Sequence, residues 1–462
     1  MNKRETPVKV GQEYTAIIEN LNSQAEGVAR IEGFAVFVRS ALPGEKVKLK
    51  ITRTYKNHAL AECREILEAA SERTIPPCEY YGSCGGCQLQ HLAYPAQLDY
   101  KRRQVEDALR RIGEITEVEV EPTVGMAEPW RYRNKAQFPV GGDTAHPEVG
   151  FYALGSHDLV DLADCLIQEK ECSRIISLLK VHMQRFGWQP YDEKTHSGLL
   201  RHLVVKSSFK TGERMIILVT NGDKLPEYQG FLEYLLEAEV GLVSLVQNIN
   251  TGRGNTILGR KNKLLYGKET ISDRIGDKEF LISPLSFYQV NPKQTEKLYQ
   301  LALELADLQG TETVVDAYCG VGTISMYAAA HAREVIGIEI VPEAVKSAAE
   351  NARYNKLDNL RFLSGSAEVI LPELLTQGIQ PHAVFLDPPR KGCAPELLLA
   401  LLQTRPEKIV YVSCNPATLA RDLKILGEAY RVERVVPVDM FPHTGHVECV
   451  VLMCASSEAG KC

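Results

Sequence analysis

Long hydrophobic runs are absent from this 462-residue sequence. The first residues, MNKRETPVKV, carry charges with no apolar stretch behind them, so no signal peptide is expected. No stretch of about 18 apolar residues occurs, so the sequence predicts no transmembrane helix. We therefore expect a cytoplasmic protein without a membrane partner. The longest apolar runs, such as KIVYVSC and ECVVLMC, have the length of buried strands.

The sequence also lacks a positive net charge. Lys and Arg total 53 against 59 Asp and Glu, which gives −6. Net charge alone therefore does not indicate a nucleic-acid partner, although an acidic protein can bind one through a local basic surface. With 44% hydrophobic and 24% charged residues, a mainly disordered chain is excluded. The length is typical of about three domains.

Residues 1–69 have the pattern of a small all-β unit. Lys46–Ile51 alternates charged and apolar residues, which places three lysines on one face of a strand. The unit holds 11 Lys and Arg against 9 Asp and Glu. The lysine face is either a solvated edge or an RNA-binding surface. Short strands in this stretch predict an OB-like barrel, with the further strands expected at 14–21, 27–31 and 34–38.

The rest of the chain divides into a mixed and an alternating part. Residues 70–275 mix strands and helices, which predicts a central α+β domain. Within it, 95–118 has helical spacing with basic residues at 101–103, and this helix is expected to pack with the C-terminal domain. From 276 to 462 short apolar runs alternate with helical stretches, which indicates an α/β domain with a parallel sheet buried on both faces.

A glycine loop at the first strand of this C-terminal domain favours a nucleoside cofactor. Asp316-Ala-Tyr-Cys-Gly-Val-Gly-Thr323 allows a tight turn and close approach of a ligand. The third glycine of the dinucleotide fingerprint is missing because position 325 is serine, and no Gly-Lys-Ser/Thr follows. Glu339 ends the next strand, where a carboxylate can accept both ribose hydroxyls. Together these features favour S-adenosylmethionine over NAD.

Two further strand ends carry reactive groups. One gives Asp387-Pro-Pro-Arg390 and the other Ser413-Cys-Asn-Pro416. Asn415 suits a helix N-cap and Pro416 the first helical position. Cys414 would then precede a helix N-terminus, where amide dipoles favour a thiolate. This context favours a nucleophile over a buried structural cysteine.

A thiolate beside a methyl donor suits methylation of uracil at C5. Addition of the thiolate to C6 makes C5 nucleophilic, and a base must later remove the C5 proton. The candidate base is Glu448, which follows the turn Phe441–His446. His446 and His443 are competing candidates for this role.

Cys78, Cys84 and Cys87 form a C-x5-C-x2-C cluster among the 12 cysteines of the chain. In a chain without a secretion signal, such a cluster indicates metal binding or chemistry and not a disulfide framework. From spacing alone, zinc and an iron–sulfur cluster are equally plausible. A fourth thiolate is required, and the spacing does not select it.

The motifs DxYCGxGT, DPPRKG, SCNPATLARDL and HTxHVE, in this order, resemble the RNA uridine C5-methyltransferase family. The resemblance covers essentially the whole chain. It implies that the N-terminal barrel is a TRAM domain that binds RNA. It also implies that the C-terminal part is a Rossmann-like methyltransferase domain that uses S-adenosylmethionine.

Carried over by position, the resemblance implies roles for individual residues. Cys414 is the expected nucleophile and Glu448 the expected proton acceptor. Phe287 and Arg133 are the expected contacts of the target base. The expected cofactor contacts are Gln289, Tyr318, Glu339 and Asp387. The expected ligands of a [4Fe-4S] cluster are Cys78, Cys84, Cys87 and Cys165.

Within the family that the chain resembles, the cluster and the TRAM-like domain favour 23S ribosomal RNA as the substrate. We expect a monomer. The alternatives are a tRNA uridine C5-methyltransferase and a non-catalytic RNA-binding protein. A DNA cytosine methyltransferase is excluded because its Pro-Cys nucleophile and later Glu-Asn-Val loop are missing.

Overall fold

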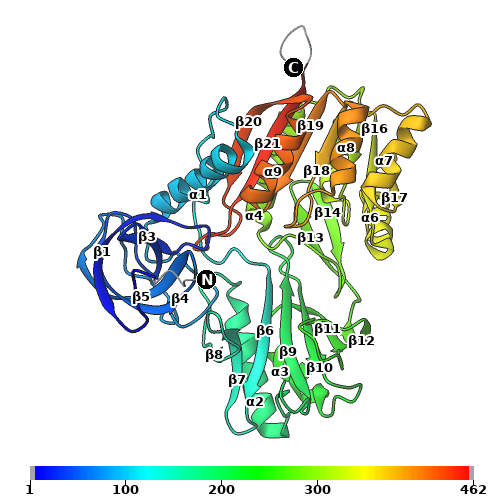
Figure 1. Ribbon diagram of the computed structural model, residues 1–462. Coiled ribbons are helices and arrows are strands. Elements are labelled where there is room, and N and C mark those ends of the chain that lie inside the picture. Colours follow the sequence, from blue (N-terminus) through cyan, green and yellow to red (C-terminus); the bar gives the residue numbers. More distant parts are fainter. Residues whose placement is uncertain (1–5, 457–462) are drawn as a thin grey trace.

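The computed structural model describes residues 6–456, and Figure 1 shows them as three parts joined around one centre. A barrel lies beside a C-terminal α/β domain, and a central domain lies beneath both. No helix within residues 6–456 is both long and apolar enough to cross a bilayer.

The N-terminal part is a closed barrel with the strand order β1-β2-β3-β5-β4, which confirms the predicted OB-like fold. The alternation in β4 places Val47, Leu49 and Ile51 in the barrel core, each at most 1% exposed. The barrel strands are β1 (Glu13–Leu21), β2 (Gly27–Ile31), β3 (Phe34–Arg39), β4 (Lys46–Thr54) and β5 (His58–Glu68).

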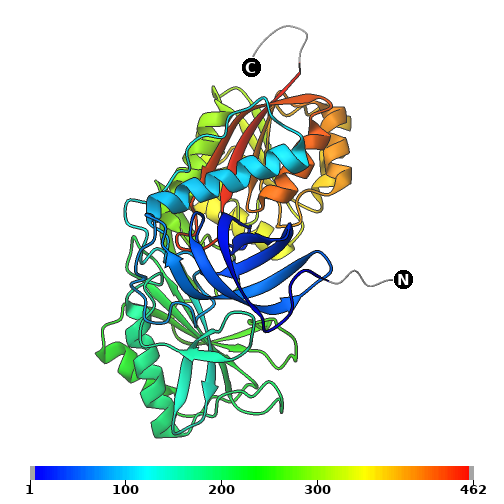
Figure 2. The same cartoon turned by 60° about the vertical axis from the view of Figure 1, so that its left-hand side comes forward.

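A long helix leaves the barrel and lies across the C-terminal sheet, as Figure 2 shows. It comprises α1 (Tyr94–Ala108) and a π-helical turn, η1 (Leu109–Gly113), so it ends five residues before the predicted end at 118. Val105 and Leu109 are buried in the same core as Leu419 and Tyr430 of the C-terminal domain. The helix thus packs where the sequence analysis placed it.

The central part is a seven-stranded sheet in the order β12-β11-β10-β9-β6-β7-β8. Two helices, α2 (Glu171–Phe186) and α3 (Tyr228–Glu237), pack on one face of it. Its strands are β6 (Lys135–Gly142), β7 (Pro147–Tyr152), β8 (Leu159–Asp161), β9 (Leu200–Ser207), β10 (Arg214–Thr220), β11 (Leu242–Ile249) and β12 (Lys261–Gly267).

The opposite face of this sheet joins the C-terminal core. Val204, Ile217 and Val219 share one hydrophobic cluster with Phe280 and Leu298. The connecting element is a hairpin of β13 (Ile271–Ile275) and β14 (Lys278–Ile282). The predicted domain boundary between 275 and 276 falls in the turn of this hairpin.

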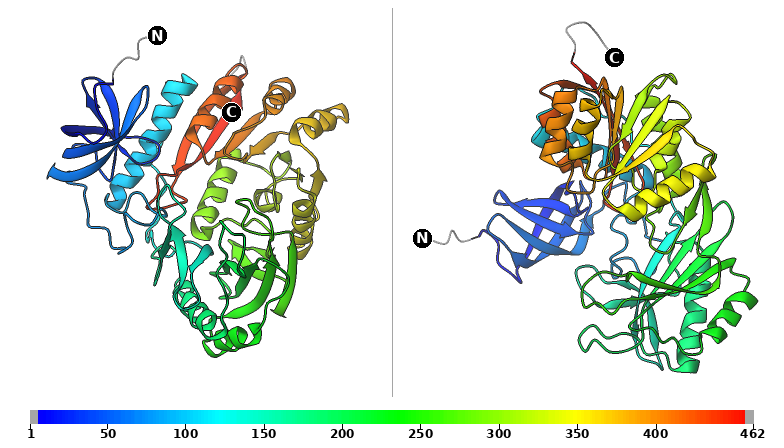
Figure 3. Two further views of the ribbon diagram at one scale, coloured as in Figure 1. Left: turned by 60° about the horizontal axis from the view of Figure 1, so that its bottom comes forward. Right: turned by 90° about the vertical axis from the view of Figure 1, so that its right-hand side faces the viewer.

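The C-terminal sheet has the order β17-β16-β15-β18-β19-β21-β20, with β15 to β19 parallel and β21 antiparallel to β19. Alternate residues of each strand enter two cores, one on each face. The predicted parallel sheet buried on both faces is confirmed. Figure 3 shows the helices on both sides of the sheet.

The strands of this domain are β15 (Thr313–Asp316), β16 (Glu334–Glu339), β17 (Leu360–Ser364), β18 (Ala383–Leu386), β19 (Lys408–Ser413), β20 (Tyr430–Val438) and β21 (Glu448–Ala455). Its helices are α4 (Pro292–Ala306), α5 (Thr323–Ala329), α6 (Pro342–Tyr354), α7 (Ala367–Thr376), α8 (Pro395–Thr404) and α9 (Pro416–Leu426).

Candidate active site

The carboxyl ends of the parallel strands meet at one edge of the C-terminal sheet, where ligands of open α/β sheets bind. The glycine loop after β15 makes the predicted tight turn, with φ of 55° at Gly320 and 82° at Gly322. A side chain at Gly322 would lie 2.9 Å from the ring of Phe362. Both glycines therefore serve the backbone path of this loop.

A cavity of about 160 Å³ lies against the glycine loop. It brings together four residues predicted from the sequence, namely Phe287, Gln289, Tyr318 and Asp387. Glu339 lies beside the cavity and not in its wall. One Glu339 carboxylate oxygen accepts the amide of Gly320 at 3.1 Å, and the other accepts the amide of Val341 at 2.8 Å.

The electrostatics of this cavity suit a cation. Asp316 is 1% exposed, and its Oδ1 has no hydrogen-bond partner among residues 6–456. Burial raises the pKa of Asp316 to about 6. Burial and the negative charge of Asp316 raise the pKa of Asp387 to about 7. Buried carboxylates without a counter-ion are unfavourable, so these residues fit a positively charged ligand such as S-adenosylmethionine. Sequence reasoning missed Asp316.

Cys414 and Glu448 lie together because of strand register. Ser413, the last residue of β19, pairs with Cys449 in the antiparallel β21. The next residue on each strand is therefore Cys414 on one side and Glu448 on the other. Asn415 caps α9 through its side chain, which accepts the amide of Ala417 at 3.1 Å, and Pro416 is the first helical residue, as predicted.

The charged groups around Cys414 and Glu448 do not favour the thiolate that was expected at Cys414. Burial and the carboxylates of Glu448 and Asp387 raise the pKa of Cys414 to about 11. Burial and Asp387 raise the pKa of Glu448 to about 8. The thiol is therefore protonated in the free site, contrary to the prediction from the helix N-terminus. The guanidinium of Arg390 lowers the pKa of both groups and is a second residue that sequence reasoning missed.

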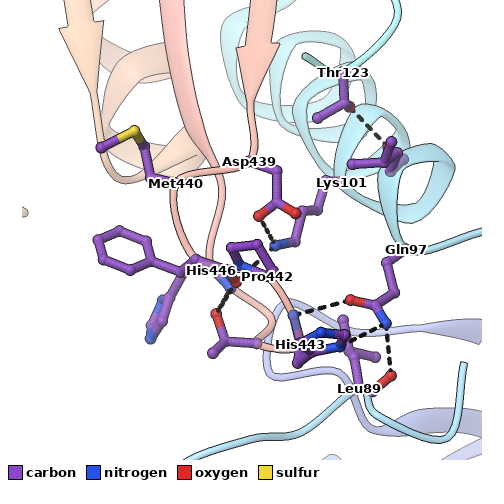
Figure 4. Close-up of polar contacts among 12 residues, drawn as sticks. Leu89, Gln97, Lys101, Thr123, Asp439, Met440, Pro442, His443 and His446 are labelled. Atoms are coloured by element: carbon purple, nitrogen blue, oxygen red, sulfur yellow. Dashed lines mark hydrogen bonds and ion pairs between the residues drawn. The ribbon is translucent and has the colours of Figure 1, made fainter. Parts of the chain in front are cut away.

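Glu448 follows a loop, residues 439–447, that we call the β20–β21 loop. Figure 4 shows that its residues are held by α1. His443 of this loop is 3% exposed and stacks on Trp130 with ring centroids 3.7 Å apart. Burial and Lys101 lower the pKa of His443 to about 4. This environment is that of a structural histidine. His446 is the exposed histidine of this loop, and partial desolvation of its ring together with the charge of Arg390 lowers its pKa.

The two predicted base contacts lie on neighbouring segments. Phe287 is 65% exposed at the cofactor cavity, with the Nζ of Lys135 at 5.9 Å from its ring centroid. Asn134 joins the segments, because its amide group donates to the carbonyl of Gln289 at 3.0 Å. Arg133, the neighbour of Asn134, lines the cavity of the cysteines and not that of the cofactor.

All four predicted cysteine ligands line one cavity of about 250 Å³. Burial raises the pKa of Cys87 to about 12 and that of Cys165 to about 11, with the other cysteines adding to both shifts. Among residues 6–456 no three His, Cys, Asp or Glu side chains are placed to hold a metal ion. The four thiols therefore surround a space instead of meeting at a point.

The loop that carries Cys78, Cys84 and Cys87 reaches the β20–β21 loop directly. We call residues 78–91 the cysteine loop. Its backbone amides at Gln88 and Leu89 both donate to the carbonyl of His443 at 2.9 Å. On the other side, Arg131 donates to the carbonyl of Cys165 at 2.8 Å and pairs with Asp164. The cysteine cavity and the catalytic pair thus share one backbone connection.

The lysines on the outer face of β4 lie beside glutamates of the neighbouring strands. Lys46 forms an ion pair with Glu68 at 3.1 Å, and Lys48 forms one with Glu13 at 2.9 Å. Lys50 lies opposite Glu62 in the register of β4 and β5. Glutamates of the neighbouring strands thus pair with Lys46 and Lys48, a pairing that the alternation within one strand could not predict.

The basic cluster of α1 is paired in the same way, with Lys101 to Asp439, Arg102 to Glu106 and Arg103 to Asp99. Five of the six basic residues in these two segments therefore form an ion pair.

Comparison with known proteins places this geometry among RNA-modifying enzymes. A family model described as tRNA (Uracil-5-)-methyltransferase matches residues 255–456, and a TRAM domain model matches residues 7–63. A relative from Clostridium tetani named an "Uncharacterized RNA methyltransferase" is 48% identical over 452 residues, covering 98% of each chain. A relative of similar name from Halalkalibacterium halodurans is 47% identical over 454 residues, covering 98% of this chain and 99% of that one.

Among solved structures, a tRNA (uracil-54, C5)-methyltransferase of Pyrococcus abyssi in complex with S-adenosyl-L-homocysteine is similar over most of the chain. It has a TM-score of 0.77 and 29% identity, and the match covers 95% of this chain and 99% of that one. The similarity therefore extends beyond the C-terminal domain to the barrel and the central domain.

Proposed function

This chain belongs to the S-adenosylmethionine-dependent RNA uracil-5-methyltransferase family, and from that premise we propose that it methylates C5 of a uridine in 23S ribosomal RNA through a covalent adduct on Cys414. The observation that carries this proposal is the placement of Cys414 opposite Glu448 beside the cofactor cavity. Among the described residues, Cys414 is the thiol whose pKa is shifted by both Glu448 and Arg390.

Cys414 starts the proposed reaction. After loss of its proton, Sγ forms a bond to C6 of the uracil, and the C5–C6 π electrons move toward C5 and the C4 carbonyl. Bound S-adenosylmethionine would supply the methyl group on its sulfonium: C5 would form a bond to the methyl carbon as the bond from that carbon to sulfur breaks, and the sulfur would leave as a neutral thioether. Tyr318, Gln289 and Asp387 hold that cofactor, and Asp387 and Asp316 match its positive charge. A bound cation offsets these carboxylates and so lowers the pKa of Cys414 from its raised value.

Glu448 completes the proposed reaction. Its carboxylate takes the proton from C5 of the methylated adduct. The C5–H electrons restore the C5–C6 double bond, and the Cys414 Sγ–C6 bond breaks. A carboxyl group with a pKa of about 8 is close enough to neutral pH to accept this proton and then lose it to water.

Substrate binding is assigned to groups around the mouth of the site. The exposed ring of Phe287 is available to stack on the target base, with Lys135 beside it. Arg133, on the adjacent segment, is assigned to the RNA near that base. The uridine must leave any stack, because the reaction needs access to its C5 and C6.

We propose that the four cysteines hold a [4Fe-4S] cluster, as the resemblance to the family implies. All four line one cavity of about 250 Å³. We assign Cys78, Cys84, Cys87 and Cys165 as ligands. The cluster would neutralise buried thiolates and fix the cysteine loop, and it has no part in the transfer of the methyl group.

A tRNA is the second candidate substrate. The full-length similarity to a tRNA (uracil-54, C5)-methyltransferase favours it, whereas the cysteine set favours ribosomal RNA. Because the catalytic pair, the cofactor cavity and the cysteines all come from one chain, we further propose a monomer acting in the cytoplasm. We also propose three functional units, 1–69, 70–275 and 276–462, with α1 belonging functionally to the last.

A trapping experiment tests the chemistry. Glu448→Gln, incubated with S-adenosylmethionine and RNA lacking 5-methyluridine, should accumulate a protein–RNA species stable on a denaturing gel. Mass spectrometry should find 5-methyluridine on the Cys414 peptide, and Cys414→Ala/Glu448→Gln should give no such species. Free methylated product at the normal rate from Glu448→Gln would contradict the role of Glu448.

A further inference from the structure

A cavity at the junction of the three parts of the molecule has no role in the chemistry described above. It has a volume of about 290 Å³ and is lined by barrel residues, the cysteine loop, Leu154 and the end of the β20–β21 loop. Cys84 and Cys87 of the cysteine loop line both this cavity and the cysteine cavity. The barrel contributes Ser23, Gln24, Arg39 and Ser40, and the β20–β21 loop contributes Gly445 and His446. Glu448 follows His446 by two residues, so the junction cavity lies against the loop that leads to the catalytic pair.

The barrel wall of the junction cavity is rigid and polar. Asn22 Oδ1 accepts the amides of Gln24 and Glu26, both at 2.9 Å, which fixes the turn between β1 and β2. Tyr100 of α1 donates to the carbonyl of Asn22 at 2.7 Å and ties this turn to the C-terminal domain. The amide side chain of Gln24 has no hydrogen-bond partner within residues 6–456. The backbone of Gln24 is therefore fixed, while its exposed side chain offers an amide donor and acceptor.

We infer that the junction cavity holds one nucleotide adjacent to the target uridine and that Gln24 contacts the edge of its base. This inference rests on the proposed RNA substrate. A volume near the low end of ligand pockets, roughly 300 Å³, suits a single nucleotide and not a helix. Flipping of the target also separates its neighbour from the stack.

The test compares two exposed positions of the barrel. Gln24→Ala should raise the KM for RNA about tenfold, as expected for loss of a contact to a base edge. The kcat at saturating RNA and the affinity for S-adenosylmethionine should not change. Lys48→Ala, the matched control on the paired face, should leave the KM for RNA unchanged.

A double-mutant cycle locates the partner of Gln24. RNA with an abasic residue next to the mapped target should bind the unmodified protein about tenfold more weakly, yet bind Gln24→Ala with no further loss. A KM that rises for Lys48→Ala and not for Gln24→Ala would overturn the inference, as would additive losses in the cycle. Absence of methylation of any RNA by the unmodified protein would contradict the proposed function instead.

A second, independent observation concerns a buried ion pair between α1 and the β20–β21 loop. Lys101 and Asp439 are both 0% exposed, with Nζ and Oδ1 2.5 Å apart. Lys101 also donates to the carbonyl of Phe441 at 3.0 Å, and Tyr94 donates to Asp439 at 2.9 Å. Figure 4 shows Lys101 reaching from α1 to this loop.

The same helix holds a strained residue of the loop. His443 has φ of 66°, a conformation that is uncommon for a residue with a side chain. Its backbone amide donates to Gln97 Oε1 at 3.0 Å, and Gln97 Nε2 lies 3.2 Å from its ring Nδ1. Gln104 donates to the carbonyl of Gly445 at 3.1 Å. Three turns of α1 thus fix the path of the loop that leads to Glu448; Figure 4 shows the contacts made by Gln97 and Lys101.

We propose that Lys101 and Gln97 are positioning residues for Glu448, acting through the β20–β21 loop. This proposal rests on the proposed role of Glu448. It predicts different effects on two steps of the reaction, methyl transfer and release of the product. Methyl transfer depends on Cys414 and the cofactor, which α1 does not hold. Release of the product depends on where the carboxylate of Glu448 lies.

The test measures both steps in single turnovers. Gln97→Ala should slow release of methylated RNA about tenfold and accumulate the covalent adduct, while the rate of methyl transfer and the affinity for S-adenosylmethionine stay unchanged. Lys101→Met/Asp439→Asn, which removes both charges of the buried pair, should behave in the same way. Arg103→Met, on the exposed side of α1, is the matched control and should leave both rates unchanged.

The outcomes separate positioning from general stability. Equal slowing of both steps in Gln97→Ala, or no slowing of release, would overturn the proposal. If Glu448→Gln itself fails to trap an adduct, the proposed role of Glu448 is contradicted, and the result is distinct from a failure of the α1 variants alone.

Discussion

At the scale of single residues, the environment of Cys414 decides its chemistry more than its neighbours in sequence do. Asn415 and Pro416 cap the helix as predicted, yet the thiol is not poised as a thiolate. Burial and two carboxylates outweigh the helix N-terminus and raise its pKa to about 11. The sequence could predict Cys414, Glu448 and Asp387 because each lies in a contiguous motif. Asp316 and Arg390 lie in two of the same motifs, but their roles depend on charged partners brought together by folding, so the motifs alone did not single them out.

Cys414→Ala provides the first prediction at this scale. The variant should bind S-adenosylmethionine with unchanged affinity, because the cofactor contacts lie on other strand ends. Methyl transfer should fall by several orders of magnitude, since no other group can saturate C6. Equilibrium binding and single-turnover transfer of a labelled methyl group would measure both quantities. Near-normal turnover would exclude the covalent mechanism.

The raised pKa of Glu448 predicts the pH dependence of release. The carboxyl group is protonated below its pKa of about 8, so the base form increases with pH. The rate of release should therefore rise about tenfold per pH unit below pH 8 and level off above it. Single-turnover release measured from pH 6 to 9 checks this, and a flat profile would contradict it.

The raised pKa of Glu448 also makes the thermal stability of the protein depend on pH. The pKa of Glu448 in the folded protein lies above the ordinary 4.5. Its protonated carboxyl group therefore makes its full contribution to the free energy of unfolding below pH 4.5, and this contribution is lost as the pH rises through 8. Glu448→Gln should therefore match the unmodified protein in thermal stability at pH 4.5 and exceed it at pH 9. Equal melting temperatures at pH 9 would show that the carboxylate is not disfavoured there.

At the scale of elements, hydrophobic periodicity predicted the faces of strands but not their partners. The alternation of β4 correctly placed Val47 and Leu49 inside the barrel. It could not show that the register of β1 and β5 sets Glu13 and Glu68 against the lysines on the outer face. In the same way, helical spacing predicted α1, whereas the burial of Lys101 depends on Asp439, more than 300 residues away.

The cap of α9 gives a prediction for an element. Asn415→Ala removes the acceptor for the Ala417 amide and a donor to the carbonyl of Arg390 at 3.0 Å. The free energy of unfolding should fall by about 1 kcal/mol, measured by thermal or denaturant unfolding. Asn415→Asp keeps the cap acceptor and should retain most of the stability. Equal losses in both variants would assign the effect to the Arg390 contact.

At the scale of the whole molecule, the cysteine cavity links the central domain to the catalytic pair. The sequence predicted three of its cysteines from their spacing, and the fourth only through the resemblance to a family. Cys165 lies 78 residues after Cys87, so its position could be tested only in the folded chain. The structure places all four around one cavity and connects the cysteine loop to His443.

Metal content gives the prediction at this scale. Purified without oxygen, the protein should be brown and carry about four irons per chain. Cys165→Ser should lose the colour and most of the iron, whereas Cys63→Ser, a half-buried barrel cysteine outside the cavity, should keep both. Elemental analysis and visible absorption would measure this. Zinc in place of iron would contradict the cluster, and full iron in Cys165→Ser would contradict the fourth ligand.

The central claim is that this chain methylates uridine C5 in 23S ribosomal RNA, and mapping of the labelled nucleotide tests it most directly. The protein is incubated with methyl-labelled S-adenosylmethionine and total RNA from cells that lack 5-methyluridine, and the label is located by nuclease digestion and mass spectrometry. We predict 5-methyluridine at a loop or bulge of 23S RNA and none with Cys414→Ala. Label confined to tRNA would contradict the ribosomal substrate, and label at any atom other than uridine C5 would contradict the proposed reaction.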